Sequence, residues 1–266
     1  MIKDVTIGAD PELFFEKDGE IISVEGLIGG TKKEPRPITD DGHSVQEDNI
    51  MAEFNIPPSN TRQDFIDHIE FVKGYLSLVA NKNNAKLNFS ASANIDRKYL
   101  KTKQALEFGC EPDFNFYSKR SNEKPSSRST LRTCGGHIHI GYDNPTQKQS
   151  EMLIFAMDIA LGLPSLELDL DDERRSMYGK AGSFRFKEFG IEYRTLSTFW
   201  TASEELIGWA YDKVQYAIEL INSGAIEKVK PYSKLIEKTI NTNDRVMAQK
   251  LIEQIEKIQI TNLTAA

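Results

Sequence analysis

Residues 135–142 read Gly-Gly-His-Ile-His-Ile-Gly-Tyr, with polar and apolar side chains in alternation. Because successive side chains of a β-strand point to opposite faces of a sheet, this alternation predicts a strand. His137 and His139 then lie on one face, and Ile138 and Ile140 lie on the other. The segment therefore predicts a sheet with one apolar face against a core and one face that carries imidazoles.

The same alternation in other segments adds charged side chains to the polar face. It pairs Glu192 with Arg194 in residues 191–196, and it pairs Asp10 with Glu12 in the first strand. The polar side chains that share a face in residues 44–56, taken as one strand, are Glu47, Asn49, Glu53 and Asn55. The segment around Cys110 contributes Glu111, Asp113 and Asn115. Together these strands predict an antiparallel sheet with an unusually acidic face.

The many carboxylates on this predicted face suggest that it binds cations. Six carboxylates would share it with the two histidines: Asp10, Glu12, Glu47, Glu53, Glu111 and Glu192. Opposed like charges in a sheet repel, by a few tenths of a kcal/mol to ~1 kcal/mol per pair. Carboxylate oxygens with an occasional imidazole suit Mg²⁺ or Mn²⁺. With Arg185 and Arg194 nearby, such ions would form a clamp for phosphoryl oxygens, whereas the alternative is a set of unrelated surface acids.

Composition limits the class of protein. The chain has 266 residues, of which 33 are basic and 40 are acidic, so the formal net charge is −7. This balance disfavours general binding to nucleic acid or to an anionic membrane. The two cysteines form no CxxC motif, the N-terminus does not resemble a signal peptide, and residues 153–168 are too short and too interrupted to span a bilayer. We therefore expect a soluble cytoplasmic protein.

Periodic apolar residues predict three long helices. They cover residues 61–81, residues 146–163 and the segment that opens at Thr201 and closes at Gly224. Beyond Gly224 the chain stays helical but turns polar, so we expect a catalytic domain of residues 1–224 and a helical tail of residues 225–266. Residues 118–132 form a basic loop that we expect to close over an anionic ligand.

Other catalytic motifs fit poorly. Residues 26–32 are glycine-rich and end in a lysine, but Thr31 stands where a P-loop requires glycine, and two prolines prevent the following helix. Cys134 precedes His137 by three residues, which leaves a zinc site with His139 open as an alternative. We find no serine or cysteine nucleophile with a well-placed base.

Five segments, in order along the chain, resemble one known family. They are Gly8-Ala-Asp-Pro-Glu-Leu-Phe-Phe, Gln46-Glu-Asp-Asn-Ile-Met-Ala-Glu-Phe-Asn-Ile-Pro-Pro, Phe108-Gly-Cys-Glu-Pro-Asp-Phe-Asn, Gly135-Gly-His-Ile-His-Ile-Gly-Tyr, and Arg174-Arg-Ser-Met-Tyr-Gly-Lys-Ala-Gly-Ser-Phe-Arg with Gly190-Ile-Glu-Tyr-Arg-Thr-Leu-Ser-Thr-Phe-Trp. They resemble the phage-type COOH-NH2 ligases (type 2), which are glutamine synthetase-like amidoligases. The similarity extends from about Ile7 to Tyr211 and does not cover the tail.

The resemblance implies an α+β fold and a reaction. The expected fold is a glutamine synthetase-like antiparallel β-sheet funnel with helices on its outer face, here with a C-terminal helical appendage. The expected activity is an ATP-dependent ligation, in which a carboxylate is phosphorylated to an acyl phosphate and an amine then forms the amide bond. ATP and Mg²⁺ (or Mn²⁺) are the expected cofactors.

The resemblance also implies roles for individual residues. Divalent metal is expected on Asp10, Glu12, Glu53, His137 and Glu192. Nucleotide contacts are expected from His137, His139, Lys180, Arg185 and Arg194. Arg185 and Arg194 would stabilise the phosphoryl group in flight, and Glu47 or Glu111 would take the proton of the amine. Glu111 and Asn55 are expected to bind substrate.

Two other functions stay open at this stage. One is a phosphotransferase on the same fold, similar to guanidino kinases, and the other is a catalytically retired binding or structural protein. The expected partners are small-molecule or peptide carboxylates and amines, with no membrane, and a homo-oligomer stays open. If the chain is phage-encoded, the cytoplasm is that of the host.

Overall fold

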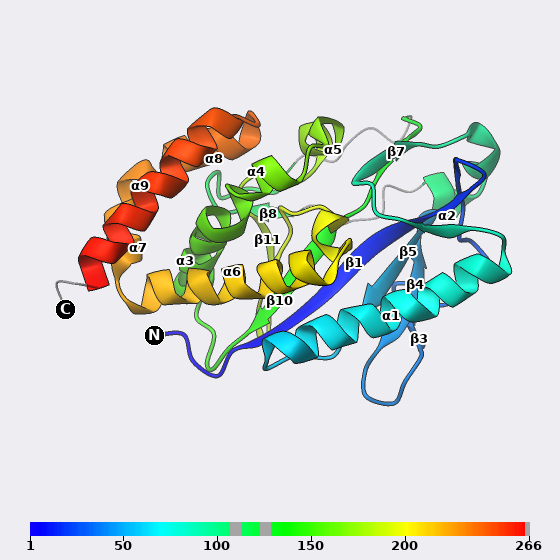
Figure 1. Ribbon diagram of the computed structural model, residues 1–266, viewed down its shortest axis with the longest axis horizontal. Coiled ribbons are helices and arrows are strands. Elements are labelled where there is room, and N and C mark those ends of the chain that lie inside the picture. Colours follow the sequence, from blue (N-terminus) through cyan, green and yellow to red (C-terminus); the bar gives the residue numbers. More distant parts are fainter. Residues whose placement is uncertain (107–112, 123–128, 264–266) are drawn as a thin grey trace.

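The computed structural model describes residues 1–106, 113–122 and 129–263 of the chain. A large antiparallel sheet runs through these residues, and long helices pack against one of its faces (Figure 1). The predicted α+β class, an antiparallel sheet with packed helices, is thus confirmed, whereas the funnel shape stays a prediction. Within the described part of the chain, the helices lack the combination of length and apolar character that crossing a membrane requires.

The sheet has the strand order β3–β4–β5–β1–β10–β12–β11–β8, with β2 and β6 also paired to β1. A second, two-stranded sheet joins β7 and β9. The strands are β1 (Thr6–Lys17), β2 (Glu20–Ile22), β3 (Arg36–Pro37), β4 (Ser44–Asp48), β5 (Met51–Asn55), β6 (Lys86–Asn88), β7 (Ser92–Asn94), β8 (Phe114–Asn115), β9 (Leu131–Thr133), β10 (Gly136–Gly141), β11 (Ser183–Lys187) and β12 (Gly190–Tyr193).

The helices lie between and after these strands. They are α1 (Arg62–Lys82), α2 (Lys103–Leu106), α3 (Gln147–Met157), α4 (Ser165–Leu168), α5 (Asp172–Met177), α6 (Glu204–Asn222), α7 (Ala225–Val229), α8 (Ser233–Asn241) and α9 (Arg245–Leu263). Short 3₁₀ turns occupy Arg97–Tyr99, Thr198–Thr201 and Lys230–Tyr232, and a π-helical turn, Asp158–Gly162, continues α3.

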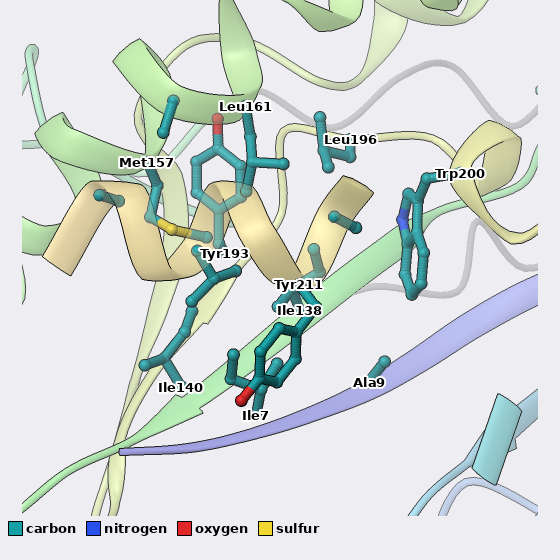
Figure 2. Packing of buried hydrophobic residues seen from close by; sticks show 14 of the residues in the cluster. Ile7, Ala9, Ile138, Ile140, Met157, Leu161, Tyr193, Leu196, Trp200 and Tyr211 are labelled. Atoms are coloured by element: carbon teal, nitrogen blue, oxygen red, sulfur yellow. The ribbon is translucent and has the colours of Figure 1, made fainter. Parts of the chain in front are cut away.

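The core lies between the apolar face of the sheet and helices α1, α3 and α6. Ile7 and Ala9 of β1 and Ile138 and Ile140 of β10 point toward these helices, and Trp200 packs beside them (Figure 2). The alternation of Ile138 and Ile140 with the two histidines therefore has the predicted consequence, because the isoleucines are fully buried in the core. The opposite face of β1 and β10 is left to the polar side chains.

The predicted helices are present, with one changed start. Thr61 caps α1 by accepting a hydrogen bond from the Asp64 N–H, and Thr146 caps α3. Helix α6 begins after Ser203 instead of Thr201, because Ser203 is the residue whose side chain caps it. The helical tail is formed by α7, α8 and α9, and buried residues of all three join the same core as the sheet. The predicted domain boundary after Gly224 stays a prediction.

The prediction of a single strand over residues 44–56 is wrong. The segment forms a hairpin of β4 and β5, with Asp48 paired to Met51 across a two-residue turn. Asn49 supports the turn with a φ of 58°, a left-handed conformation that asparagine tolerates better than most residues. The turn reverses the chain, so the alternation of the first half does not carry over to the second. Residues 86–94, whose side chains also alternate between polar and apolar, form two strands, β6 and β7, in different sheets.

Strand register brings the polar residues together. Asp10 of β1 lies opposite His137 of β10, and His139 lies opposite Glu192 of β12. Glu192 in turn lies opposite Arg185 of β11. On the other side of β1, Glu12 lies opposite Glu53 of β5. Because directly opposed residues share a face, this register forms a continuous row of charged groups across the sheet.

A second group of polar residues is buried behind the sheet, at the π-helical turn. The Asp158 carboxylate is fully buried and accepts a hydrogen bond of 2.7 Å from the Tyr193 hydroxyl. Burial raises the pKa of Asp158 to about 7, because the hydrogen bonds that favour the ionised form do not offset the loss of water. In the unfolded chain the same carboxyl titrates near its ordinary value of 3.8.

We predict that Asp158 makes the protein less stable as the pH rises from about 4 to 7. Over this range the unfolded chain loses a proton that the folded chain keeps, so the free energy of unfolding falls by at most ~4 kcal/mol. The variant Asp158→Asn does not titrate and should lack this loss. Urea unfolding of both proteins at pH 5 and pH 8 checks the prediction, and equal changes between the two pH values would contradict it.

Candidate functional site

The first cluster on the polar face joins Asp10, His139 and Glu192, from β1, β10 and β12. One potential ligand atom from each residue lies within 4.8 Å of the others. The Asp10 carboxylate approaches both histidines, at 3.3 Å from His139 Nε2 and 3.2 Å from His137 Nδ1. We call this group the first cluster. Its geometry follows directly from the strand register described above.

The second cluster joins Glu12, Asp48 and Glu53, from β1, β4 and β5. Their carboxylate oxygens also lie within 4.8 Å of one another, and all three residues are buried. Lys32, in the glycine-rich loop before β3, places its ammonium 2.6 Å from Asp48 Oδ2. Because Asp10 and Glu12 are two residues apart on one strand, the two clusters lie side by side on the sheet.

Glu12 is held by the start of the histidine strand. The Gly135 N–H donates a hydrogen bond of 2.5 Å to Glu12 Oε2. A side chain at this position would force the His137 ring to shift, because a Cβ on Gly135 would lie 2.5 Å from His137 Nε2. Gly135 thus lets the backbone approach both Glu12 and His137.

Positive groups surround the first cluster. The Arg194 guanidinium hydrogen-bonds Asp113 and Glu192, and its Nη1 lies 3.2 Å from His137 Nδ1. Lys187 Nζ lies 2.6 Å from Glu192 Oε2, and Arg185 Nη1 lies 3.7 Å from Glu192 Oε1. These cations hold the Glu192 carboxylate in its ionised form.

The pKa values in the first cluster reflect this pairing. Burial and Asp10 would raise the pKa of Glu192, but Arg194 and the histidines hold it at about 2. Burial also opposes ionisation of Asp10, yet the two histidines lower its pKa well below the ordinary value. The histidines themselves diverge. Burial and Arg194 lower the pKa of His137, whereas the Asp10 carboxylate raises that of His139 despite its burial.

The second cluster has far less positive charge. Burial and the neighbouring Asp48 raise the pKa of Glu12 to about 8. Burial, together with Asp10, Asp48 and Glu12, raises the pKa of Glu53 well above its ordinary value. Glu53 Oε2 is buried and accepts no hydrogen bond from the described residues. A group of three acids with this electrostatic penalty fits a divalent cation, which would let all three carboxylates ionise.

Glu47 lies on the opposite face from Glu53, because the hairpin turn changes the alternation. It is paired with Ala52, and its Oε1 accepts hydrogen bonds from the N–H groups of Gly26, Ile28 and Gly29. The expectation that Glu47 shares the polar face is therefore wrong. Its carboxylate holds the glycine-rich loop instead, and its neighbour Asp48 supplies the third acid of the second cluster.

The remaining predicted residues are more dispersed. Asn55 lies two residues beyond Glu53 and donates hydrogen bonds to Ser44 Oγ (3.2 Å) and Gln46 Oε1 (3.3 Å). Lys180 lies in the loop between α5 and β11, where its carbonyl accepts a hydrogen bond of 3.1 Å from Thr195 Oγ1. Glu111 lies outside the described residues. Cys134 is buried and belongs to neither cluster.

The basic loop contributes a structural arginine. Arg132 is 1% exposed, and its guanidinium donates to Asn49 Oδ1 at 3.0 Å and to the carbonyl of Ala105 at 2.8 Å. It therefore anchors the hairpin turn next to Asp48, whereas the sequence analysis counted it among the charges of a loop expected to close over an anionic ligand. A pocket opens beside the second cluster here, and its lining includes Glu12, Asp48, Asp113, Arg132, His137, Arg174, Tyr178 and Arg194.

Four residues of the site were missed in the sequence: Lys32, Asp48, Asp113 and Lys187. Lys187 had a usable signal, because it shares the alternation of Arg185 along β11. Asp113 was placed on the polar face but given no role, and it now pairs with Arg194. Asp48 required knowledge of the turn at Asn49. Lys32 reaches the site from a loop, and a loop has no regular alternation from which the direction of its side chain could be predicted.

Comparison with known protein families finds a match for this chain. A sheet face with two acidic clusters and flanking arginines is typical of enzymes that transfer phosphoryl groups on bound cations. Residues 126–256 match the model of the family described as phage phiEco32-like COOH.NH2 ligase type 2. The match confirms the predicted resemblance to this family. No curated protein matches the chain.

The matched region differs from the predicted one at both ends. It continues past Gly224 to residue 256, so the expectation that the resemblance stops before the tail is wrong. It begins at residue 126, and the acidic residues of β1, β4 and β5 lie before it. The predicted site residues inside it are His137, His139, Lys180, Arg185, Glu192 and Arg194.

Adjacent residues of β4 provide a test of the second cluster. We predict that Asp48→Asn weakens Mn²⁺ binding by about tenfold or more, because it removes one of three carboxylates around the cation. Glu47→Gln should change Mn²⁺ affinity less than ~2-fold, since its side chain faces away and its amide oxygen still accepts from the loop. Calorimetric titration measures both, and equal weakening by the two variants would contradict the assignment.

Proposed function

We propose that this protein is an ATP-dependent carboxylate–amine ligase that forms an amide bond through an acyl phosphate. The observation that carries the proposal is the pair of adjacent acidic clusters on one sheet face, flanked on one side by Arg185, Lys187 and Arg194. The family match supports the same reaction, because its description names a COOH.NH2 ligase. Ligation of a carboxylate needs activation, since oxide is a poor leaving group and phosphate is a good one.

The donor set supports magnesium or manganese as the cation. The second cluster offers three carboxylates and a buried Glu53 oxygen that accepts nothing from the described residues. Glu12, Glu53 and Asp48 would hold one ion, and Asp10, Glu192 and the histidines would hold another. Hard oxygen ligands favour these ions over zinc, for which thiolate and imidazole are more usual.

The basic side of the face suits the nucleotide phosphates. Arg194 is fixed by Asp113 and Glu192, so its guanidinium needs no reordering to meet a developing negative charge. Arg185 has a 30% exposed side chain and can reach toward solvent and ligand. His137, His139 and Lys180 are proposed to contact the nucleotide beside them. Bound Mg²⁺–ATP would supply the phosphoryl group and neutralise its charge.

The chain's own residues then have separable tasks in this reaction. Arg185 and Arg194 stabilise the phosphoryl group as it moves to the substrate carboxylate. Glu111 and Asn55 are proposed to bind substrate, and Glu111 to take the proton of the attacking amine. Glu47 is withdrawn from that role because its carboxylate binds the backbone of the glycine-rich loop.

Further proposals concern setting and partners. We propose small-molecule or peptide carboxylates and amines as substrates, with no general affinity for nucleic acid. The cytoplasm, of a host cell if the chain is phage-encoded, is the proposed location. A homo-oligomer is compatible with this function.

We predict that the full chain with ATP and Mg²⁺ or Mn²⁺ releases ADP and phosphate in the presence of a matching acid and amine. Free amino acids, short peptides and polyamines are screened in pairs, and mass spectrometry identifies the product. Glu53→Ala and Arg194→Ala should each lower the rate about 100-fold or more, because Glu53 is proposed to hold a cation and Arg194 to stabilise the transferred phosphoryl group. Glu227→Ala and Arg62→Ala, at exposed positions far from the face, are the matched controls.

The product distinguishes the remaining functions. An amide together with ADP and phosphate supports the ligase. A phosphorylated acceptor with ADP alone would identify a phosphotransferase instead. ADP release that survives both substitutions would refute the site, and a lack of cation-dependent ATP binding in calorimetry would favour a retired binding protein.

A further inference from the structure

A second pocket lies outside the polar face, and its lining comes from α5 and from the junction of α8 with α9. It is open and has a volume of about 310 Å³. Two contacts hold its walls together, since Asp172 of α5 pairs with Arg245 of α9 at 2.7 Å and with the amide of Asn243. The lining residues are Asp172, Arg175, Asn241, Thr242, Asn243 and Arg245.

Arg175 lines this pocket, and some N–H groups of its guanidinium have no hydrogen-bond acceptor among the described residues. The residue is 3% exposed. Its Nη2 donates to Ser165 Oγ at 3.4 Å and lies 3.7 Å from Asp169 Oδ2. Its Nε and Nη1 are buried and have no acceptor among the described residues. A buried cation with open N–H groups is costly, so a pocket next to it favours an anionic oxygen as occupant.

Asn243 offers the opposite kind of group in the same pocket. Its amide nitrogen donates to the Asp172 carboxylate, which fixes the orientation of the amide because a carboxylate only accepts. Its Oδ1 is therefore the other atom, and it is buried without a donor among the described residues. This acceptor favours an occupant that also carries an N–H or O–H group.

The charged residues that line the pocket restrict the charge of the ligand that it can bind. Arg175 and Arg245 are positive and Asp172 is negative. A carboxylate monoanion suits Arg175, whereas a phosphate dianion would be repelled by Asp172. A positive donor near Asn243 would in turn be attracted by Asp172.

We propose that this pocket binds a small amino acid as a zwitterion. Its carboxylate contacts the Arg175 guanidinium, and its ammonium group donates to Asn243 Oδ1 near Asp172. The two unsatisfied groups of the pocket are thus matched by the two charged groups of one ligand. The proposal stands apart from the ligase reaction, because none of these residues belongs to either acidic cluster.

The pocket nevertheless adjoins the candidate active site through α5. Arg174, the residue before Arg175, donates to the carbonyls of Thr195 (3.1 Å) and Leu196 (2.7 Å), directly after Arg194. It also lines the pocket beside the second cluster. One short helix therefore carries an arginine toward each of the two pockets.

The test uses the full chain in EDTA, without nucleotide or divalent cation, so that its result does not depend on the ligase. Thermal shift and calorimetry are run with each of the standard amino acids, and with acetate, methylamine and inorganic phosphate at matched ionic strength. We expect at least one amino acid to bind and to raise the melting temperature, and acetate and methylamine to bind at least tenfold more weakly.

Two variants locate the binding site. Arg175→Gln removes the cation, and Asn243→Gly removes the acceptor at a position whose φ of 56° glycine adopts readily. Each should weaken amino-acid binding about tenfold or more, whereas Lys250→Gln, an exposed charge change on α9, should not. Circular dichroism verifies folding, and Asn243→Gly serves alone if Arg175→Gln does not fold.

Three results would overturn the proposal. The first is that no amino acid binds, in which case water satisfies the pocket. The second is tighter binding of phosphate than of every amino acid. The third is amino-acid binding that a folded Asn243→Gly variant leaves unchanged, which would place the ligand elsewhere.

Discussion

The repulsion among buried carboxylates on one face of the sheet is the constraint on which the rest of the site depends. Asp10, Glu12 and Glu53 are brought together by the pairing of β1 with β5 and β10, and the same pairing buries isoleucines on the other face. The register cannot shift by one residue without exchanging these two faces. The acids are therefore fixed by the packing of the core, and their charge has to be offset where they lie.

The two clusters offset this charge differently. In the first, Arg194 and Lys187 pair with Glu192, and the carboxylate stays ionised with a pKa of about 2. In the second, Lys32 pairs with Asp48, and the pKa of Glu12 rises to about 8. In the proposed function, this contrast gives the stronger demand for a divalent cation to the second cluster. The first cluster, with its basic neighbours, is then proposed to face the negatively charged phosphate oxygens.

Buried arginines fix the backbone segments that carry the residues of this face. Arg132 holds the hairpin turn at Asn49, and Arg174 holds the carbonyls that follow Arg194. Both donate hydrogen bonds to neutral oxygens. They therefore fix the backbone without forming ion pairs with the acids of the two clusters. Arg175 differs because two of its nitrogens find no acceptor among the described residues. The fold thus uses arginine for three purposes: pairing with acids, holding backbone, and lining a second pocket.

The sequence by itself indicated β10 and most of β12, although the strand predicted over residues 191–196 ends at Tyr193. It also indicated the polar face with Asp10, Glu12, His137 and Glu192 and the long helices, because alternation and caps are local signals. It could not determine which side chains of β4 lie on the polar face. The two-residue turn at Asn49 is not visible as a break in the alternation, and it places Asp48 instead of Glu47 on that face. Nor could it show that Lys32 reaches Asp48, or that Arg132 is buried. Those outcomes depend on contacts between distant segments, which only the tertiary structure decides.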